Sequence, residues 1–389
     1  MFTLPAFDPV TAPESVAPRG SFARWHTRVR KLPEFAGEFP VATLAEEILI
    51  EGPGQIKALV THAGNPVLST PNGRRLDRAL ASLEFMTAID FYVNETTRHA
   101  HIILPPTSSL ERGHYDLAFH LFAVRNTAKF SPPLFAPDSE TRHDWEILAE
   151  LQTRMAHDGV FGNLLGRVSH KLLKRFFGPE RILDLGLRFG PYGKFNPLAK
   201  GLTLRKLKQA PHGIDLGPLS PCLAARLRTS DKRIELAPDV LVKDIARVKT
   251  KLLDPSHESN GNLLLIGRRQ LRSNNSWMHN TDRLIKGKAR CTILMHPNDA
   301  AQRDLKPGQN VTVRSRVGNV VVPIEISEEM MPGVVSIPHG WGHDRPGVQL
   351  EVAQRQAGQS INDVTDDLST DTLCGTAAFN GTWVAVESA

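Results

Sequence analysis

The segment from Gly267 to Asn280 (GRRQLRSNNSWMHN) is the part of the sequence best suited to binding a ligand. It places three Arg, three Asn and two Ser within fourteen residues, directly after an apolar run. Guanidinium groups bind phosphates through paired hydrogen bonds, and Asn and Ser offer donors and acceptors to polar rings. The pattern would suit a ligand with phosphates and a heterocycle, but from spacing alone a polar surface turn capped by Asn and Ser is the favoured interpretation.

A second candidate segment, residues 338–344 (PHGWGHD), combines glycines with histidines. Gly340 and Gly342 would let the backbone approach a ligand closely, and His339 and His343 would offer hydrogen-bond donors. Two histidines four residues apart suggest a metal site when they share a helix face. Here the segment follows a predicted strand and is broken by glycines, so a metal site is disfavoured.

A third polar segment, Ser360 to Asp371, is dense in side chains that bond to nearby backbone. It lacks the central Gly and the terminal Glu of an EF-hand, so a turn network is expected rather than a calcium site. Elsewhere, neither GxxxxGK[ST] nor GxGxxG occurs, and no GxSxG motif or Cys/His pair offers a nucleophile. Spacing alone therefore predicts a two-domain ligand binder without catalytic machinery.

The elements that position these segments begin with an alternation of strands and helices in residues 41–157. Strands are expected at 56–61, 84–90 and 101–104, and helices at 74–83 and 144–155. This alternation predicts a parallel sheet, here one half of a doubly wound α/β domain. Ligands of such sheets bind beyond the carboxyl ends of the strands, which selects the loops 62–65 and 90–97.

From residue 238 to residue 389 the pattern changes to short strands with tight turns. Strands are expected at 262–269, 292–296, 311–317, 320–326, 334–338 and 382–387, with a short helix at 298–305. Gly318-Asn319 is a hairpin signal between the two alternating strands. Several short strands with one or two small helices predict a closed β-barrel.

The remaining segments and the charge say less about function. Residues 1–40 are expected to form a Pro-rich extended arm, and 158–237 a basic, Pro- and Gly-rich connector with helices. The net charge is +6 and the isoelectric point about 9.3, with much of the surplus between Arg167 and Lys208. The cations of 167–177 fit the wet face of an amphipathic helix. No nucleic-acid-binding module is present, so nucleic-acid binding is not predicted.

The cysteines and the hydropathy pattern bear on compartment. Cys222, Cys291 and Cys374 are isolated from one another, so they form neither a disulfide framework nor a CxxC site, which is typical of a reducing compartment. No apolar run approaches the roughly 20 residues of a membrane span, and the first residues do not have the pattern of a signal peptide. The expected location is the cytoplasm.

Taken together, the segments resemble the molybdopterin oxidoreductases of the dimethyl-sulfoxide-reductase superfamily, which includes formate dehydrogenases and nitrate reductases. The resemblance covers residues 50–155 and 235–389. It is carried by NPVLSTPNGRRLD at 65–77, DFYVNETTRHAHIILP at 90–105, the segment 267–280, LMHPNDA at 294–300, GQNVTV at 308–313, PHGWG at 338–342 and NDVTDD at 362–367. His101 stands where the family usually has Asp.

The resemblance implies a partial doubly wound α/β domain followed by a double-psi β-barrel, the molybdopterin-dinucleotide-binding domain. It also implies the cofactor bis(molybdopterin guanine dinucleotide) with molybdenum. Arg268 would neutralise phosphate, the glycines would admit the edge of the cofactor, and the Asn side chains would orient a ring. By motif position, the implied cofactor contacts are Gly64, Asn65, Asp90, Gly267, Arg268, Ser273, Asn275, Ser276, His339, Gly340, Asn362 and Asp363.

The chain departs from the family in what it lacks. Members of this branch begin with a Cys-rich iron–sulfur segment, followed by a region that carries the protein ligand to molybdenum, and neither is recognisable here. We therefore expect the C-terminal portion of a larger enzyme, inactive without an N-terminal half that holds the iron–sulfur cluster. The expected partners are that half, or a complementary subunit, and an electron-transfer protein. The alternative is a non-catalytic scaffold subunit with the same fold.

Overall fold

The computed structural model describes residues 22–117, 119–155, 178–193, 201–221, 223, 227, 229–253 and 261–389. The chain divides into two compact units. One comprises residues 20–104 together with 239–389, and the other comprises 105–238 with residues 1–19. Within the described residues, no helix is long and apolar enough to cross a membrane.

The first part of the larger unit is a three-stranded parallel sheet in the order β3-β4-β5. Its strands are β3 (Ala58–His62), β4 (Phe85–Ile89) and β5 (Ile102–Ile103). The helices that accompany it are α1 (Leu44–Leu49), α2 (Pro66–Ser69) and α3 (Gly73–Ala81). Their apolar side chains form one core, which includes Ile48, Val67, Leu76, Leu80 and Met86. The parallel sheet predicted from the alternating pattern is confirmed, with strands shorter than expected.

The second part of the larger unit is a closed six-stranded barrel in the order β10-β14-β11-β13-β12-β15. Its strands are β10 (Leu263–Arg268), β11 (Ile293–Met295), β12 (Asn310–Arg314), β13 (Asn319–Ile326), β14 (Val334–Pro338) and β15 (Thr382–Ser388). Buried residues alternate along β12 and β13, and their side chains fill the barrel with those of the other strands. The fold class expected from the sequence, α/β with a closed barrel in the C-terminal region, is confirmed.

The hairpin between β12 and β13 differs from its prediction. Its loop spans residues 315–318, where the Ser315 amide donates to the Gly318 carbonyl at 2.9 Å, and Asn319 already belongs to β13. Gly318 is required for another reason: a β-carbon there would lie 2.7 Å from the carbonyl oxygen of Asp363. The glycine therefore permits a close contact between the hairpin and a distant loop.

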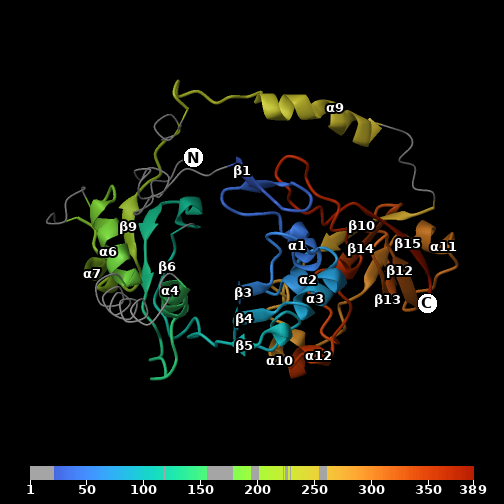
Figure 1. Ribbon diagram of the computed structural model, residues 1–389, viewed down its shortest axis with the longest axis horizontal. Helices are drawn as coiled ribbons and strands as arrows, with labels where there is room; N and C mark the ends of the chain where they lie inside the picture. The colour runs from blue at the N-terminus through green and yellow to red at the C-terminus, as the bar shows by residue number, and fades with distance from the viewer. Residues whose placement is uncertain are drawn as a thin grey trace. The chain divides into compact units, whose positions relative to one another are not determined.

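Helices α2 and α3 lie between the sheet and the barrel (Figure 1). The Arg75 side chain of α3 donates to the Asp367 carboxylate, and Arg74 donates to Asp363 at 3.1 Å. The sheet and the barrel are thus joined by ion pairs through one helix.

The larger unit also contains β1 (Phe22–His26), β2 (Pro33–Phe35), η1 (Val41–Thr43), η2 (Thr97–His99), α9 (Asp239–Leu253), α10 (Asp282–Ile285), α11 (Pro297–Ala301), α12 (Glu351–Gln354) and η5 (Ile361–Asp363).

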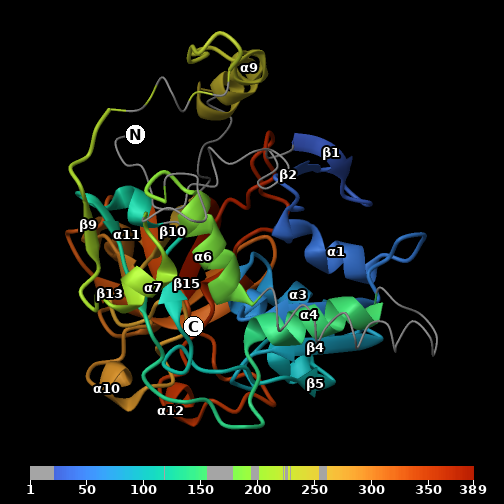
Figure 2. The same cartoon turned by 90° about the vertical axis from the view of Figure 1, so that its left-hand side faces the viewer.

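The smaller unit has its own core, which sequence patterns did not reveal. Its elements are β6 (His114–Tyr115), η3 (Phe119–Phe122), β7 (Asn126–Ala128), β8 (Phe130–Ser131), α4 (Asp144–Met155), α6 (Pro179–Phe189), α7 (Leu204–Lys208) and β9 (Ile214–Gly217). Leu187 of α6 and Leu207 of α7 are fully buried against Phe130, and Figure 2 shows the two helices side by side. The predicted basic helix at 167–177 lies outside the described residues.

Candidate functional site

The segment 267–280 comprises the last two residues of β10 and the polar loop that follows them out of the barrel. We refer to it below as the 267–280 loop. Arg272, Asn274 and Asn275 are exposed, and the Trp277 side chain is 64% exposed. Asn274 and Asn275 have φ of 43° and 60°, the left-handed region that Asn tolerates better than most residues. The loop therefore presents amide and guanidinium donors outward beside an aromatic ring.

Gly340 holds this loop in place. A β-carbon on Gly340 would lie 2.0 Å from the Asn275 carbonyl oxygen and 3.2 Å from the Ser276 amide nitrogen. The neighbouring His339 amide donates to the Arg268 carbonyl at 3.0 Å. Burial, together with the positive charge of Arg269, lowers the pKa of His339 to about 4, so this imidazole is neutral at pH 7. The structure thus brings together seven residues selected from the sequence: Gly267, Arg268, Ser273, Asn275, Ser276, His339 and Gly340.

Arg268 is held by the barrel itself. Its guanidinium donates to the Ser336 carbonyl and to both the carbonyl (2.7 Å) and the hydroxyl (2.9 Å) of Thr292. Burial lowers the pKa of Arg268. Arg268 therefore links β10 to β14 and to Thr292, the residue before β11, and the phosphate-binding role expected for it stays a prediction.

A basic cavity of about 720 Å³ lies beside Arg268. Its lining includes Gln270 and Arg272 from the 267–280 loop and the cations Lys286, Lys288 and Arg290. The Arg290 guanidinium donates to the carbonyls of Leu284 and Lys286, which shapes the wall around it. With Glu325 and Glu329 as its acidic members, the cavity has more cations than anions and suits an anionic ligand.

Asn362 and Asp363 lie apart from the 267–280 loop, where the barrel meets α3. Asn362 is buried, donates to the Leu68 carbonyl at 2.7 Å and accepts from Thr365. Asp363 accepts from Arg74 and from Arg345, the latter at 2.7 Å. A smaller cavity of about 210 Å³ borders this junction. Both residues selected from the sequence thus make internal contacts, and a contact with the cofactor stays a prediction.

Gly64, Asn65 and Asp90 follow the carboxyl ends of β3 and β4, which pair in parallel with His62 opposite Ile89. The Asn65 amide donates to Glu95 at 2.7 Å. Asp90 accepts from the amide of Phe91 at 2.6 Å, and burial raises the pKa of Asp90. An added β-carbon on Gly64 would meet no atom closer than 3.8 Å, so packing within the chain does not require glycine there.

Sequence reasoning missed a buried hydrogen-bonded chain under the 267–280 loop. Glu95 Oε1 lies 2.7 Å from His343 Nδ1, His343 Nε2 lies 2.8 Å from His279 Nδ1, and His279 Nε2 lies 2.8 Å from Ser273 Oγ. The side chains of Glu95 and His343 are both 0% exposed. The sequence suggested His343 only as a hydrogen-bond donor to a ligand or as a metal ligand beside His339, and no local spacing signals its pairing with Glu95, 248 positions away.

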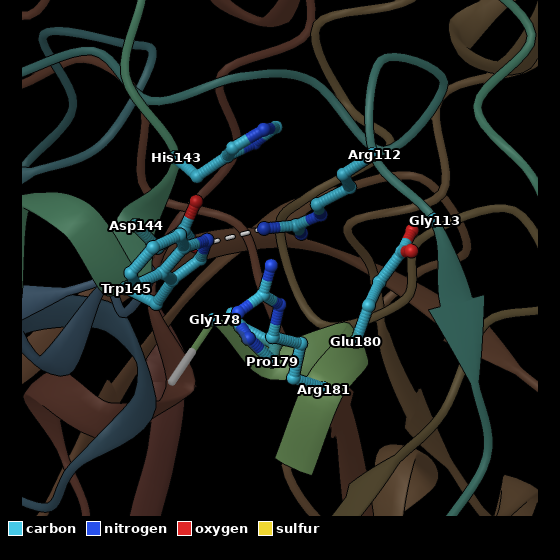
Figure 3. A pocket seen from close by; sticks show the side chains of 9 residues that line it. All are labelled: Arg112, Gly113, His143, Asp144, Trp145, Gly178, Pro179, Glu180 and Arg181. Carbon is cyan, nitrogen blue, oxygen red and sulfur yellow. Dashed lines mark hydrogen bonds and ion pairs between the residues drawn. The ribbon is translucent and has the colours of Figure 1, made fainter. Parts of the chain in front are cut away.

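A further cavity, of about 600 Å³, belongs to the smaller unit. Arg112 donates to Asp144 at 2.8 Å, and His143 Nδ1 lies 2.7 Å from the Thr107 hydroxyl. Figure 3 shows Arg112, Asp144 and Arg181 converging beside the Trp145 ring. Within the described residues, no group of three or more His, Cys, Asp or Glu side chains is placed to hold a metal ion.

Comparison with known proteins matches two family descriptions to separate stretches of the chain. "Molybdopterin oxidoreductase" matches residues 13–154, and "Molydopterin dinucleotide binding domain" matches residues 263–383. These domains imply a molybdopterin cofactor. The second stretch contains the 267–280 loop, the Gly340 turn and most of the barrel.

Individual relatives agree with these matches. The chain is 32% identical over 109 residues to the assimilatory nitrate reductase catalytic subunit of Bacillus subtilis, covering 28% of this chain and 14% of that protein. It is 24% identical to the trimethylamine-N-oxide reductase of Haemophilus influenzae, covering 79% of this chain and 40% of that protein. It is also 24% identical to the F420-dependent formate dehydrogenase subunit alpha of Methanocaldococcus jannaschii, covering 79% of this chain and 42% of that protein.

Among solved structures, acetylene hydratase from Pelobacter acetylenicus superposes with a TM-score of 0.65 at 17% identity. The superposition covers 91% of this chain and 47% of that chain, and it shows the shared fold alone. The chain thus spans less than half the length of these relatives.

Proposed function

The chain belongs to the molybdopterin oxidoreductase family, and from this premise we propose that it is the C-terminal cofactor-binding portion of a molybdenum oxidoreductase. Its chemistry would be formate dehydrogenase-like or nitrate reductase-like, in the cytoplasm, with an electron-transfer protein as partner. The single observation that carries the proposal is the 267–280 loop, seated on Gly340 with its donors exposed beside a basic cavity.

The donor set fits the proposed cofactor, bis(molybdopterin guanine dinucleotide). Arg272 would pair with a phosphate, because it is exposed at the edge of the basic cavity. Asn274 is also exposed and would hydrogen-bond a polar ring, and Trp277 offers a face for that ring. When bound, the cofactor supplies redox chemistry at molybdenum, while these side chains bind and orient it.

A complementary polypeptide is the second element of the proposal. Strands of parallel sheets are usually covered on both faces, yet β3 is an edge strand whose Val60 side chain is 50% exposed. We infer that an N-terminal half, or a separate subunit, covers β3 and supplies the iron–sulfur cluster and the ligand to molybdenum. Without that polypeptide the chain would be inactive.

The mass of the protein isolated from its native source tests this second element. A mass above 43.0 kDa, or a polypeptide that copurifies in equal amount, supports it. A 43.0 kDa chain that sediments alone contradicts it.

Molybdenum and guanine nucleotide released from the native protein by acid test the cofactor. We expect both in stoichiometric amounts, and Arg272→Ala produced in the native host should retain less of each. Arg314→Ala, which removes an exposed pair with Glu387 on the barrel surface, is the matched control and should retain the normal amount. Arg268→Ala is a poorer test, because it also removes the bonds that Arg268 makes across the barrel.

A non-catalytic scaffold is the second candidate function. It is favoured by the engagement of Arg268, Asn362 and Asp363 with groups of the chain itself. A native protein without molybdenum and guanine nucleotide would support the scaffold and contradict the enzyme.

A further inference from the structure

The buried chain Glu95–His343–His279–Ser273 links the two parts of the larger unit. Glu95 precedes η2 near the parallel sheet, His343 follows β14 of the barrel, and His279 and Ser273 belong to the 267–280 loop. Ser273 is 3% exposed and His279 is 6% exposed. The Trp341 ring packs on His279 with a centroid distance of 4.3 Å, which keeps the imidazole in place.

The charge of Glu95 determines where a proton must sit. Hydrogen bonding and the charge of His343, with a hydrogen bond from Asn65, hold the pKa of Glu95 below its usual value against the opposing effect of burial. An isolated carboxylate in such a site is strongly destabilised unless a cation pairs with it. His343, at 2.7 Å, can provide that cation by holding protons on both ring nitrogens.

His279 is the neutral member of the chain. Burial first, and then the charges of His343 and Arg290, lower its pKa to about 3, while Glu95 acts in the opposite direction. A neutral imidazole has one donor and one acceptor nitrogen. If His343 Nε2 carries a proton, His279 Nδ1 must accept a hydrogen bond from it. The one proton of the neutral His279 ring is then on Nε2 and must donate to Ser273 Oγ.

The geometry points to a proton-carrying chain in which the charge of Glu95, through His343 and His279, sets the direction of the Ser273 hydrogen bond. With His343 doubly protonated, Ser273 Oγ accepts from His279 and its own hydrogen is available to another group. Transfer of one proton out to a base in solvent reverses this order. The Ser273 hydrogen leaves, the His279 Nε2 proton moves to Ser273 Oγ, and the His343 Nε2 proton moves to His279 Nδ1.

The hydrogen-bonded chain itself does not depend on the proposed function. Only its role, to orient a loop that holds the cofactor, rests on that function. Ser273 lies inside the loop that would hold the cofactor and stabilises its turn, because its amide donates to the Gln270 carbonyl and its carbonyl accepts from the Met278 amide of the same loop. Glu95, His343 and His279 are therefore positioning residues for that loop. The same chain gives the loop a buried store for one proton.

Nitrogen-15 NMR of histidine side chains in the 389-residue protein, without cofactor, tests the chain directly. We expect His279 to carry its proton on Nε2, which donates to Ser273, and to accept on Nδ1 the hydrogen bond from His343. In Glu95→Gln, His343 should be neutral, with its proton on Nδ1, and His279 should change to the Nδ1–H tautomer. In Ser273→Ala, the matched control, His279 should keep its Nε2 proton because Glu95 still sets the direction.

An unchanged His279 tautomer in Glu95→Gln would overturn the proposal. If Glu95→Gln does not fold, the tautomer of His279 in the wild-type protein decides instead. A His279 that carries its proton on Nδ1 in the wild-type protein would then overturn the proposal. Because no cofactor is added, a native protein lacking molybdenum would contradict the proposed function and leave this result standing.

Discussion

Gly340 and the Asn275 carbonyl lie in a contact that only glycine permits, since any β-carbon would fall 2.0 Å from that oxygen. The contact fixes the 267–280 loop against the turn that follows β14. Gly340 also has a φ of 102°, so a side chain would be strained there as well as crowded. The position of the proposed cofactor loop thus depends on one missing methyl group.

Replacing Gly340 with Ala should destabilise the protein by about 2–4 kcal/mol, because the steric overlap adds to the backbone strain. Gly308→Ala is the matched control. Gly308 has a φ of 80°, but nothing lies within 4 Å of its added β-carbon, so we expect a cost of only about 1 kcal/mol from strain. Urea unfolding measures both changes. Equal losses would show that the contact with Asn275 contributes nothing.

Stability should fall as the pH is lowered from about 6.5, before carboxylates begin to titrate. The folded-state pKa values of His279 and His339, about 3 and about 4, lie below the ordinary value of 6.5. At a pH between these folded-state pKa values and 6.5, the unfolded chain binds protons that the folded protein does not, so acid favours unfolding. Thermal unfolding across this pH range measures the slope. His339→Gln should reduce the slope, and an unchanged slope would contradict the assignment to His339.

Arg345 should be a major source of stability at the junction of sheet and barrel. Its side chain is 11% exposed and lies 3.2 Å from Asp77 and 2.7 Å from Asp363. Removing it leaves Asp363 paired only with Arg74 and Asp77 paired with Arg98 and His99, so Arg345→Ala should cost about 1–3 kcal/mol. The exposed pair of Arg314 and Glu387 is the control, and Arg314→Ala should cost less than about 1 kcal/mol. Chemical unfolding measures the free energy of unfolding of both variants. Equal losses would mean that the Arg345 network contributes no more than the surface pair.

Val60→Lys should weaken association with the proposed complementary polypeptide and leave the stability of the chain itself nearly unchanged. The reason is the 50% exposure of Val60 on β3, where a charge remains hydrated until another chain covers it. Val321, 45% exposed on the barrel strand β13, is the matched control position. Copurification of the partner from the native host measures the effect. Equal recovery of the partner with Val60→Lys and Val321→Lys would mean that the partner does not cover β3.

Periodicity predicted much of the fold because it reports which face of an element is buried. The alternation in β12 and β13 and the apolar runs of β3 and β4 correspond to observed strands. The core of the smaller unit was missed because β6 and β8 have only two residues each, too few to show a period. Short strands of this kind are defined by tertiary contacts.

The site could be predicted only where its residues are close in sequence. The 267–280 loop and the Gly340 turn were selected by composition, and the parallel pairing of β10 with β14 brings them together. The internal contacts of Arg268, and of Asp363 with Arg345, depend on packing between elements that spacing does not reveal. His279 and Glu95 were missed for the same reason.

The division of the chain also has a consequence for its synthesis. The sheet of residues 20–104 and the barrel of 239–389 belong to one unit, and residues 105–238 are translated between them. At about 5–20 residues per second, a ribosome needs on the order of ten seconds to make that stretch. Asn72 and Arg75 bond to Asp367, so the nascent sheet must wait for almost the whole chain to emerge before it can dock. Until the barrel has been made, chaperones would have to shield the apolar surface of the nascent sheet.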